Sequence, residues 1–268
     1  MVSIATTTSA YLYAIAAPSP AVSIAALPGV VDAAGRSGAP QWISNGSLAA
    51  VTSAFEGRKV RPERRNLAAH QGVLRALVDV GIPFLPVAFG VVVPSHEDLL
   101  ELLSANEEAI GKDLERLTGK VEMGLKVRWD VPNIFEFLVF RNPQLARLRD
   151  QVIGKPGGPS HGDKIALGQA FEELLNEERE QHAATVKAAL SAWVLEFKND
   201  PPRDEKMILN LSCLIGRKQE RAFEQAVLRA ASCFDDNYAF DYSGPWPPYH
   251  FVTVTLPVPA RSELVGAQ

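Results

Sequence analysis

The sequence has 268 residues, enough for one large domain or two of ordinary size, and 47% of them are hydrophobic, which allows a substantial core. Its formal net charge of −4 gives no electrostatic reason to expect a nucleic-acid partner. No stretch reaches the roughly 18 uninterrupted apolar residues of a membrane span, and no basic residue precedes Arg36. We therefore expect a soluble, cytoplasmic chain that has neither a transmembrane helix nor an export signal.

The first part of the sequence predicts short strands. The apolar run Tyr11–Ala16 is typical of a buried strand. Segments 41–44 and 47–56 predict the two arms of a hairpin, because the intervening Asn45 and Gly46 both tolerate positive φ.

Two helices and a short strand follow. The first helix begins near Pro62 and ends at Gly81, and the second is capped by Ser95. Between them, the segment 82–93 predicts an apolar strand that is broken by Pro86 and Gly90. The expected apolar positions are Leu67, His70, Leu74, Leu77 and Val78 in the first helix and Leu99, Leu103, Ile110, Leu114 and Leu117 in the second.

The segment KVEMGLKVRWD predicts an amphipathic strand that begins at Lys120. Its expected buried face is Val121, Met123, Leu125, Val127 and Trp129. Its expected solvent face is Lys120, Glu122, Gly124, Lys126 and Arg128. This charged face fits either pairing with charges on a neighbouring strand or a docking surface for another protein.

The rest of the chain alternates helices and strands. We expect helices over 131–140, 142–153, about 163–198 and 217–234, and strands over 205–216, 238–244 and 249–256. The predicted fold class is therefore α+β with two domains, an N-terminal α+β domain over 1–119 and a C-terminal domain over 120–268 that ends in a short tail. The second domain is expected to be a modified ferredoxin-like sandwich with an antiparallel sheet and long helices.

No catalytic, cofactor-binding or metal-binding residues can be assigned from the sequence. The loop GKPGGPS lacks the spacing of a phosphate-binding loop, and no two histidines stand at the spacing of a metal-binding pair. We expect His70 to be a hydrogen-bonded core residue, and Cys213 and Cys233 to be buried thiols in a reducing compartment. The residues by themselves therefore offer no candidate catalytic, cofactor or metal site.

The segment YSGPWPPYHFV, residues 242–252, combines three prolines with four aromatic residues. Prolines stiffen the backbone, and Trp246 and Tyr249 can bury large rings while each keeps one polar atom. The segment fits either a rigid connector that closes one end of a core or an exposed platform for protein contact. The candidate contact residues are Tyr242, Trp246, Pro247 and Tyr249, followed by Lys120, Glu122, Lys126 and Arg128.

Taken together and in this order, KVEMGLKVRWD, MILNLSCLIGR and YSGPWPPYHFV resemble the gas vesicle protein F/L family. YLYAIA, RPERRNLAAHQGVLRAL and PFLPVAFG resemble its N-terminal half, so that the resemblance spans roughly residues 11–254. One departure is Ala88, since the family pattern commonly has a basic residue after LPV.

The resemblance implies a minor structural or assembly protein of gas vesicles that contacts their small, hydrophobic shell protein and other accessory proteins, without enzymatic activity, nucleic acid or membrane. It implies a location at the gas vesicle in the cytoplasm. A chaperone that leaves before the vesicle matures is one alternative. A small-molecule-binding ferredoxin-like module is another, and it requires a pocket with convergent polar groups.

Overall fold

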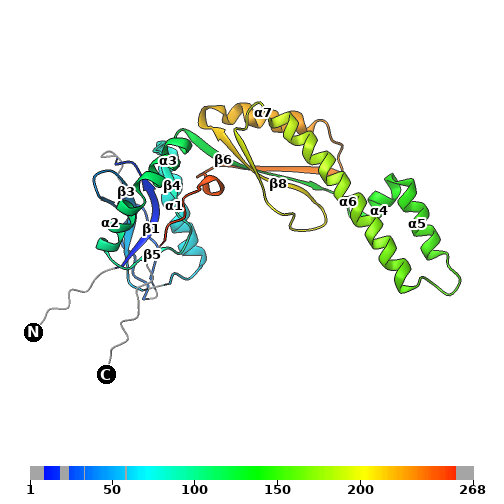
Figure 1. Cartoon of the computed structure of the whole chain (residues 1–268), viewed down its shortest axis with the longest axis horizontal. Helices are drawn as coiled ribbons and strands as arrows, with labels where there is room; N and C mark the ends of the chain where they lie inside the picture. The colour runs from blue at the N-terminus through cyan, green and yellow to red at the C-terminus, as the bar shows by residue number, and fades with distance from the viewer. Residues whose placement is uncertain (1–8, 19–23, 33, 58, 258–268) are drawn as a thin grey trace, which may run out of the picture. The chain divides into compact units, whose positions relative to one another are not determined.

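The computed structural model describes residues 9–18, 24–32, 34–57 and 59–257, and these form two compact units. Unit 1 comprises the described residues within 1–122 and 245–257, and unit 2 comprises 123–244 (Figure 1). The domain boundary expected at residue 119 stays a prediction. By its contacts, however, the segment 245–257 belongs with the N-terminal unit, and the expected tail beyond Pro257 lies outside the described residues.

Unit 1 contains a sheet with the order β2-β3-β1-β4, in which β5 also pairs with β1. The strands of this sheet pair in the antiparallel direction, and β2 and β3 form the predicted hairpin around Gly46, which has a φ of 100°. The strands are β1 (Ser9–Ala16), β2 (Gln41–Ser44), β3 (Ala49–Phe55), β4 (Phe84–Pro86) and β5 (Val92–Val93).

Helices complete this unit: α1 (Arg64–Val80), α2 (His96–Ala105) and α3 (Glu107–Leu117). Gly81 ends α1 in the left-handed conformation, as predicted. The buried stripe of α1 runs through Asn66, Ala69 and Val73, whereas Leu67 is exposed, so the assignment of Leu67 to the stripe is wrong.

The single helix expected after Ser95 is two helices. The side-chain amide of Asn106 donates to the carbonyl of Leu102 at 2.8 Å, and Asn106 has a non-helical φ of −117°. Such a local bond competes with continuation of the helix, which explains the break. The apolar face nevertheless continues, because Leu99, Leu103, Ile110 and Leu114 are all buried.

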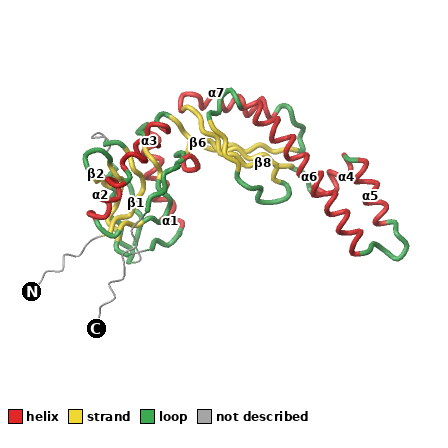
Figure 2. Tube along the Cα trace, viewed as in Figure 1, coloured by secondary structure: helices red, strands yellow, loops and turns green. Residues whose placement is uncertain are grey.

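Unit 2 has the element order β-α-β-β-α-β of a ferredoxin-like fold, with an enlarged first crossover (Figure 2). Its sheet has the order β7-β8-β6-β9, and β7 pairs with β8 in the antiparallel direction. The mixed α+β class is confirmed. The elements are β6 (Lys120–Trp129), α4 (Ile134–Arg141), α5 (Pro143–Ile153), α6 (His161–Leu190), β7 (Glu196–Asn199), β8 (Met207–Gly216), the short 3-10 helix η1 (Arg217–Gln219), α7 (Glu220–Ala231) and β9 (Tyr238–Trp246).

Three predictions fail in the second half of the chain. The long helix ends at Leu190, and the following residues form β7, in which Phe197 pairs with Cys213 of β8. The strand expected over 249–256 is a 3-10 helix, η2 (Tyr249–Phe251), followed by backbone outside any strand. Cys213 is buried as expected, but Cys233 is exposed.

Candidate protein-contact site

The aromatic and proline-rich segment contributes to the core of unit 1. Pro247, Pro248 and Phe251 are buried, and Tyr249 is half-buried. The hydroxyl of Tyr249 lies 3.1 Å from Nε2 of His70 on α1. The connector interpretation therefore describes this half of the segment, and Pro247 offers no exposed surface.

His70 is a buried, hydrogen-bonded core residue, as predicted. Its Nδ1 lies 2.8 Å from the hydroxyl of Tyr11, so both ring nitrogens meet a tyrosine hydroxyl. Burial lowers the pKa of His70 to about 4 and raises the pKa values of the Tyr11 and Tyr249 hydroxyls. The imidazole is therefore neutral at physiological pH, when it offers one donor and one acceptor.

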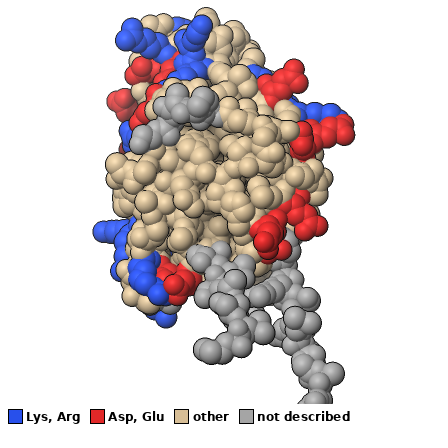
Figure 3. All heavy atoms as spheres, turned by 90° about the vertical axis from the view of Figure 1, so that its left-hand side faces the viewer, with Lys and Arg blue, Asp and Glu red and all other residues tan. Residues whose placement is uncertain are grey.

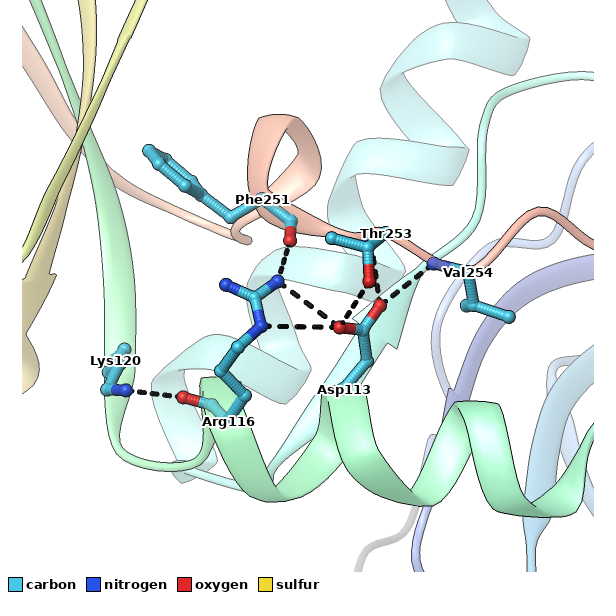
Figure 4. A network of polar contacts seen from close by, with 6 residues as sticks. All are labelled: Asp113, Arg116, Lys120, Phe251, Thr253 and Val254. Carbon is cyan, nitrogen blue, oxygen red and sulfur yellow. Dashed lines mark hydrogen bonds and ion pairs between the residues drawn. The ribbon is translucent and has the colours of Figure 1, made fainter.

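A polar clasp fixes the chain that follows η2 (Figure 4). The carboxylate of Asp113 on α3 accepts hydrogen bonds from the amide of Thr253 at 2.6 Å, the amide of Val254 at 2.9 Å and the hydroxyl of Thr253 at 2.8 Å. Arg116 donates both to Asp113 and to the carbonyl of Phe251. Burial alone would raise the pKa of Asp113, but these hydrogen bonds outweigh it and hold the pKa below its ordinary value.

Sequence reasoning missed Asp113 and Arg116, although a signal was present. Asp113 stands between Ile110, Leu114 and Leu117 on the buried stripe of α3. A carboxylate on a buried stripe requires hydrogen-bond donors, so its position predicts a polar partner. The partner itself is 140 residues away in the sequence, which is why no local pattern identifies it.

Glu122 is also held by the returning segment. Only 5% of its surface is exposed, and it accepts hydrogen bonds from the backbone amide of His250 at 3.0 Å and from Nδ1 of His250 at 2.6 Å. Lys120 is half-buried, and its ammonium donates to the carbonyl of Arg116. The expectation of a uniformly solvent-facing row is therefore wrong at Glu122. Of the residues on this face of β6, only Lys126 and Arg128 are exposed.

Two of the predicted contact rings are exposed. Tyr242 in β9 has 41% of its surface exposed and donates a hydrogen bond of 2.6 Å to Glu224 of α7. Trp246 has 40% exposed. These two rings, together with Lys126 and Arg128, are the candidates that the structure places at the surface.

An apolar groove of about 350 Å³ lies in unit 1 between β4 and the chain that follows η2. None of the described residues that line it is charged. One wall is Leu85–Ala88, and the other is Val252–Leu256 without Thr253, whose side chain does not line the groove. Ile15, Val91 and Tyr249 complete the lining. The polar clasp at Asp113 therefore fixes one wall of an uncharged groove.

A second hollow, of about 550 Å³, lies in unit 2 beside α6 and β8, and charged residues such as Arg179, Glu180 and Asp200 line part of it. Arg179 in its lining donates to the backbone carbonyls of Asp204, Glu205 and Met207. This guanidinium therefore holds the end of the loop that precedes β8. Within the described residues, no three histidine, cysteine or acidic side chains gather in a way that could hold a metal ion. Likewise, none of the described helices is both long and apolar enough to cross a bilayer.

The surface also has an uncharged face. Figure 3 shows one side of the molecule, on which lysine, arginine and acidic residues lie mainly around the margin and uncharged residues fill the centre. An uncharged area with a charged margin is a common arrangement at protein contacts.

Comparison with known proteins gives a consistent result. The family model for gas vesicle synthesis protein GvpL/GvpF matches residues 9–253. Gas vesicle protein F of Streptomyces sp. (strain CB03234) is 30% identical over 207 residues, which cover 77% of this chain and 85% of that protein. Gas vesicle protein F of Nostoc sp. (strain PCC 7120 / SAG 25.82 / UTEX 2576) is 28% identical over 74% of this chain and 81% of that protein.

Solved structures agree with the fold. The crystal structure of the gas vesicle protein GvpF from Anabaena sp. PCC7120 is similar, with a TM-score of 0.78 and 26% identity, over 93% of this chain and 100% of that one. GvpF from Microcystis aeruginosa has the same fold, with a TM-score of 0.75 and 24% identity. Since the family model spans nearly all of the sequence, this gas-vesicle-associated chain belongs to the GvpL/GvpF family of gas vesicle synthesis proteins.

Proposed function

We propose that the protein is a minor structural or assembly component of gas vesicles that binds the small hydrophobic shell protein while the vesicle forms in the cytoplasm. The observation that carries this proposal is the family match over residues 9–253. Enzymatic activity and a cofactor are not part of the proposal.

Two surface features support binding to a hydrophobic partner. The apolar groove of unit 1 is lined by uncharged residues wherever the structure describes the chain, and the rings of Tyr242 and Trp246 are each about two-fifths exposed. A shell subunit with a water-repelling face would aggregate unless a soluble protein covered that face before assembly. Aromatic rings suit this task, because they provide large contact areas at little conformational cost.

A pulldown from cells that form gas vesicles tests the proposal. The tagged full-length chain should recover the shell protein, and the same tag on an unrelated soluble protein should not. Recovery of other vesicle proteins without the shell protein would count against direct binding. Crosslinking before lysis would preserve a complex that is too short-lived to survive washing.

The alternative of a dissociating chaperone predicts the same complex but a different fate. Washed, intact vesicles should retain a structural component and should lack a chaperone. Immunoblotting of purified vesicles therefore separates the two roles. The family name of the relatives, a gas vesicle synthesis protein, is compatible with both.

A further inference from the structure

We propose that the apolar groove between β4 and Val252–Leu256 binds one uncharged, apolar segment of the shell protein in an extended conformation. Asp113 and Arg116 position Val252–Leu256, which forms the outer wall of this groove. This inference rests on the proposed function, since it assigns the shell contact to a site. It goes further than that function because it names the binding site: the shell protein could instead bind at the exposed rings of Tyr242 and Trp246.

The chemistry of the lining selects the kind of occupant. Leucine, isoleucine, valine, alanine and proline side chains supply most of it, together with the ring of Tyr249, and none of the lining residues that the structure describes carries an ionised group that could neutralise a charge. Placing an unpaired charge there would be costly. The volume of about 350 Å³ lies at the lower end of the range for binding pockets, which suits a few small apolar side chains.

The backbone of the outer wall selects the conformation of the occupant. The amides of Thr253 and Val254 are used by Asp113. Among the described residues, the backbone groups of Thr255 and Leu256 have no hydrogen-bond partner. An extended segment can pair with such a free edge, as in strand addition. The opposite wall contains Pro86, which has no amide hydrogen, so contact with β4 would be mainly through side chains.

The rival occupants are the chain beyond Pro257 and a second copy of the protein, and the sequence argues against the first of them. The chain beyond Pro257 contains Arg261 and Glu263, whose charges would find no opposite charge among the described lining residues of the groove. A second copy of the protein is the other possibility. Both are distinguishable from the shell protein by the mass of a crosslinked product.

Photocrosslinking maps the contact directly. A benzophenone amino acid replaces Ala88 or Thr255, which line opposite walls and are exposed, and Ala68 on the outer side of α1 serves as the control position. The full-length chain is irradiated in cells that make the shell protein. The proposal expects shell-protein adducts from positions 88 and 255 and none from position 68. Adducts only with the same chain or with a second copy would overturn it.

Charge insertion provides a second test. Ala88→Glu and Thr255→Glu each place an anion at an exposed position of the groove, and Ala68→Glu is the matched control. Both groove variants should recover at least about tenfold less shell protein, because an unpaired charge in an apolar contact costs more than ~1.4 kcal/mol. Unchanged melting temperatures would show that the variants are folded.

The positioning role of the clasp has its own readout. Asp113→Asn should lower crosslinking from position 255 more than from position 88, because the clasp holds only the outer wall. Equal losses at both positions would indicate a general loss of structure and would contradict the positioning role.

The outcomes separate this proposal from the proposed function. If the full-length chain binds the shell protein and a benzophenone at Trp246 captures it while positions 88 and 255 do not, the groove is wrong and the function stands. If the chain recovers no shell protein at all, both are wrong.

Discussion

The hydroxyl of Tyr249 lies 3.1 Å from Nε2 of His70, although 179 residues separate them in the sequence. This hydrogen bond joins the segment after β9 to α1 of the N-terminal unit. The same unit also binds that segment through Glu122 and Asp113. The last described residues of the chain are therefore part of unit 1, which is built from segments at both ends of the described chain.

The buried, neutral state of His70 predicts acid sensitivity. Its pKa is about 4 in the folded protein and near 6.5 when unfolded, so between these values the unfolded state binds more protons. Stability should fall as the pH drops from 6.5 to 4, by a contribution on the order of 3 kcal/mol from this group. Urea unfolding at a series of pH values should show that the free energy of unfolding depends less steeply on pH in His70→Gln than in the unmodified protein. Parallel curves would contradict this account.

Removing the carboxylate of Asp113 should destabilise unit 1. Asp113→Ala removes the buried carboxylate that accepts hydrogen bonds from the amides of Thr253 and Val254, and a hydrogen bond to a charged group contributes about 1.5–3 kcal/mol. We expect a loss of about 2–4 kcal/mol in the free energy of unfolding. Glu108→Ala, on the same helix but in an exposed ion pair with Lys112, is the control and should have little effect. A similar loss in both variants would contradict the clasp.

Two phenylalanines provide a matched pair for packing. Phe251 is completely buried, and Phe140 on α4 is 92% exposed. Phe251→Ala should lower the free energy of unfolding by about 3–5 kcal/mol, because the large cavity cannot collapse fully. Phe140→Ala should change it by less than about 0.5 kcal/mol. Thermal or chemical denaturation measures both, and a large effect of Phe140→Ala alone would mean that its ring is covered in solution.

The exposed rings predict a partial loss of shell binding. Tyr242→Ala and Trp246→Ala remove rings that are about two-fifths exposed, and binding of the shell protein should weaken without unfolding of the domain. Tyr242→Phe keeps the ring but removes the hydrogen bond to Glu224, so it should bind like the unmodified protein. Pulldown with unchanged recovery for both alanine variants would exclude these rings as contacts.

The sequence predicts most of the elements because local patterns determine them. Alternating side chains identify β6, the dipeptide Asn45–Gly46 identifies the first hairpin, and Gly81 marks the end of α1. These signals depend on backbone geometry within a few residues. The confirmed family resemblance depends on longer motifs of the same kind.

The failed predictions involve partners that are distant in the sequence. Glu122 has the spacing of a solvent-facing residue, but His250 covers it. The alternating segment VTVTL has the pattern of a strand, but Asp113 binds two of its amides in place of a neighbouring strand. Phe197 fits a helical stripe, yet pairing with β8 places it in β7. In each case a tertiary contact overrides the local pattern.

The central claim is that this protein keeps the shell protein in solution by binding it, and co-expression followed by size-exclusion chromatography without detergent tests it most directly. The account predicts that the shell protein stays in the supernatant and elutes with the full-length chain, and that Ala88→Glu shifts it to the pellet. A shell protein that sediments equally with and without the chain, while the chain elutes alone, would contradict the account.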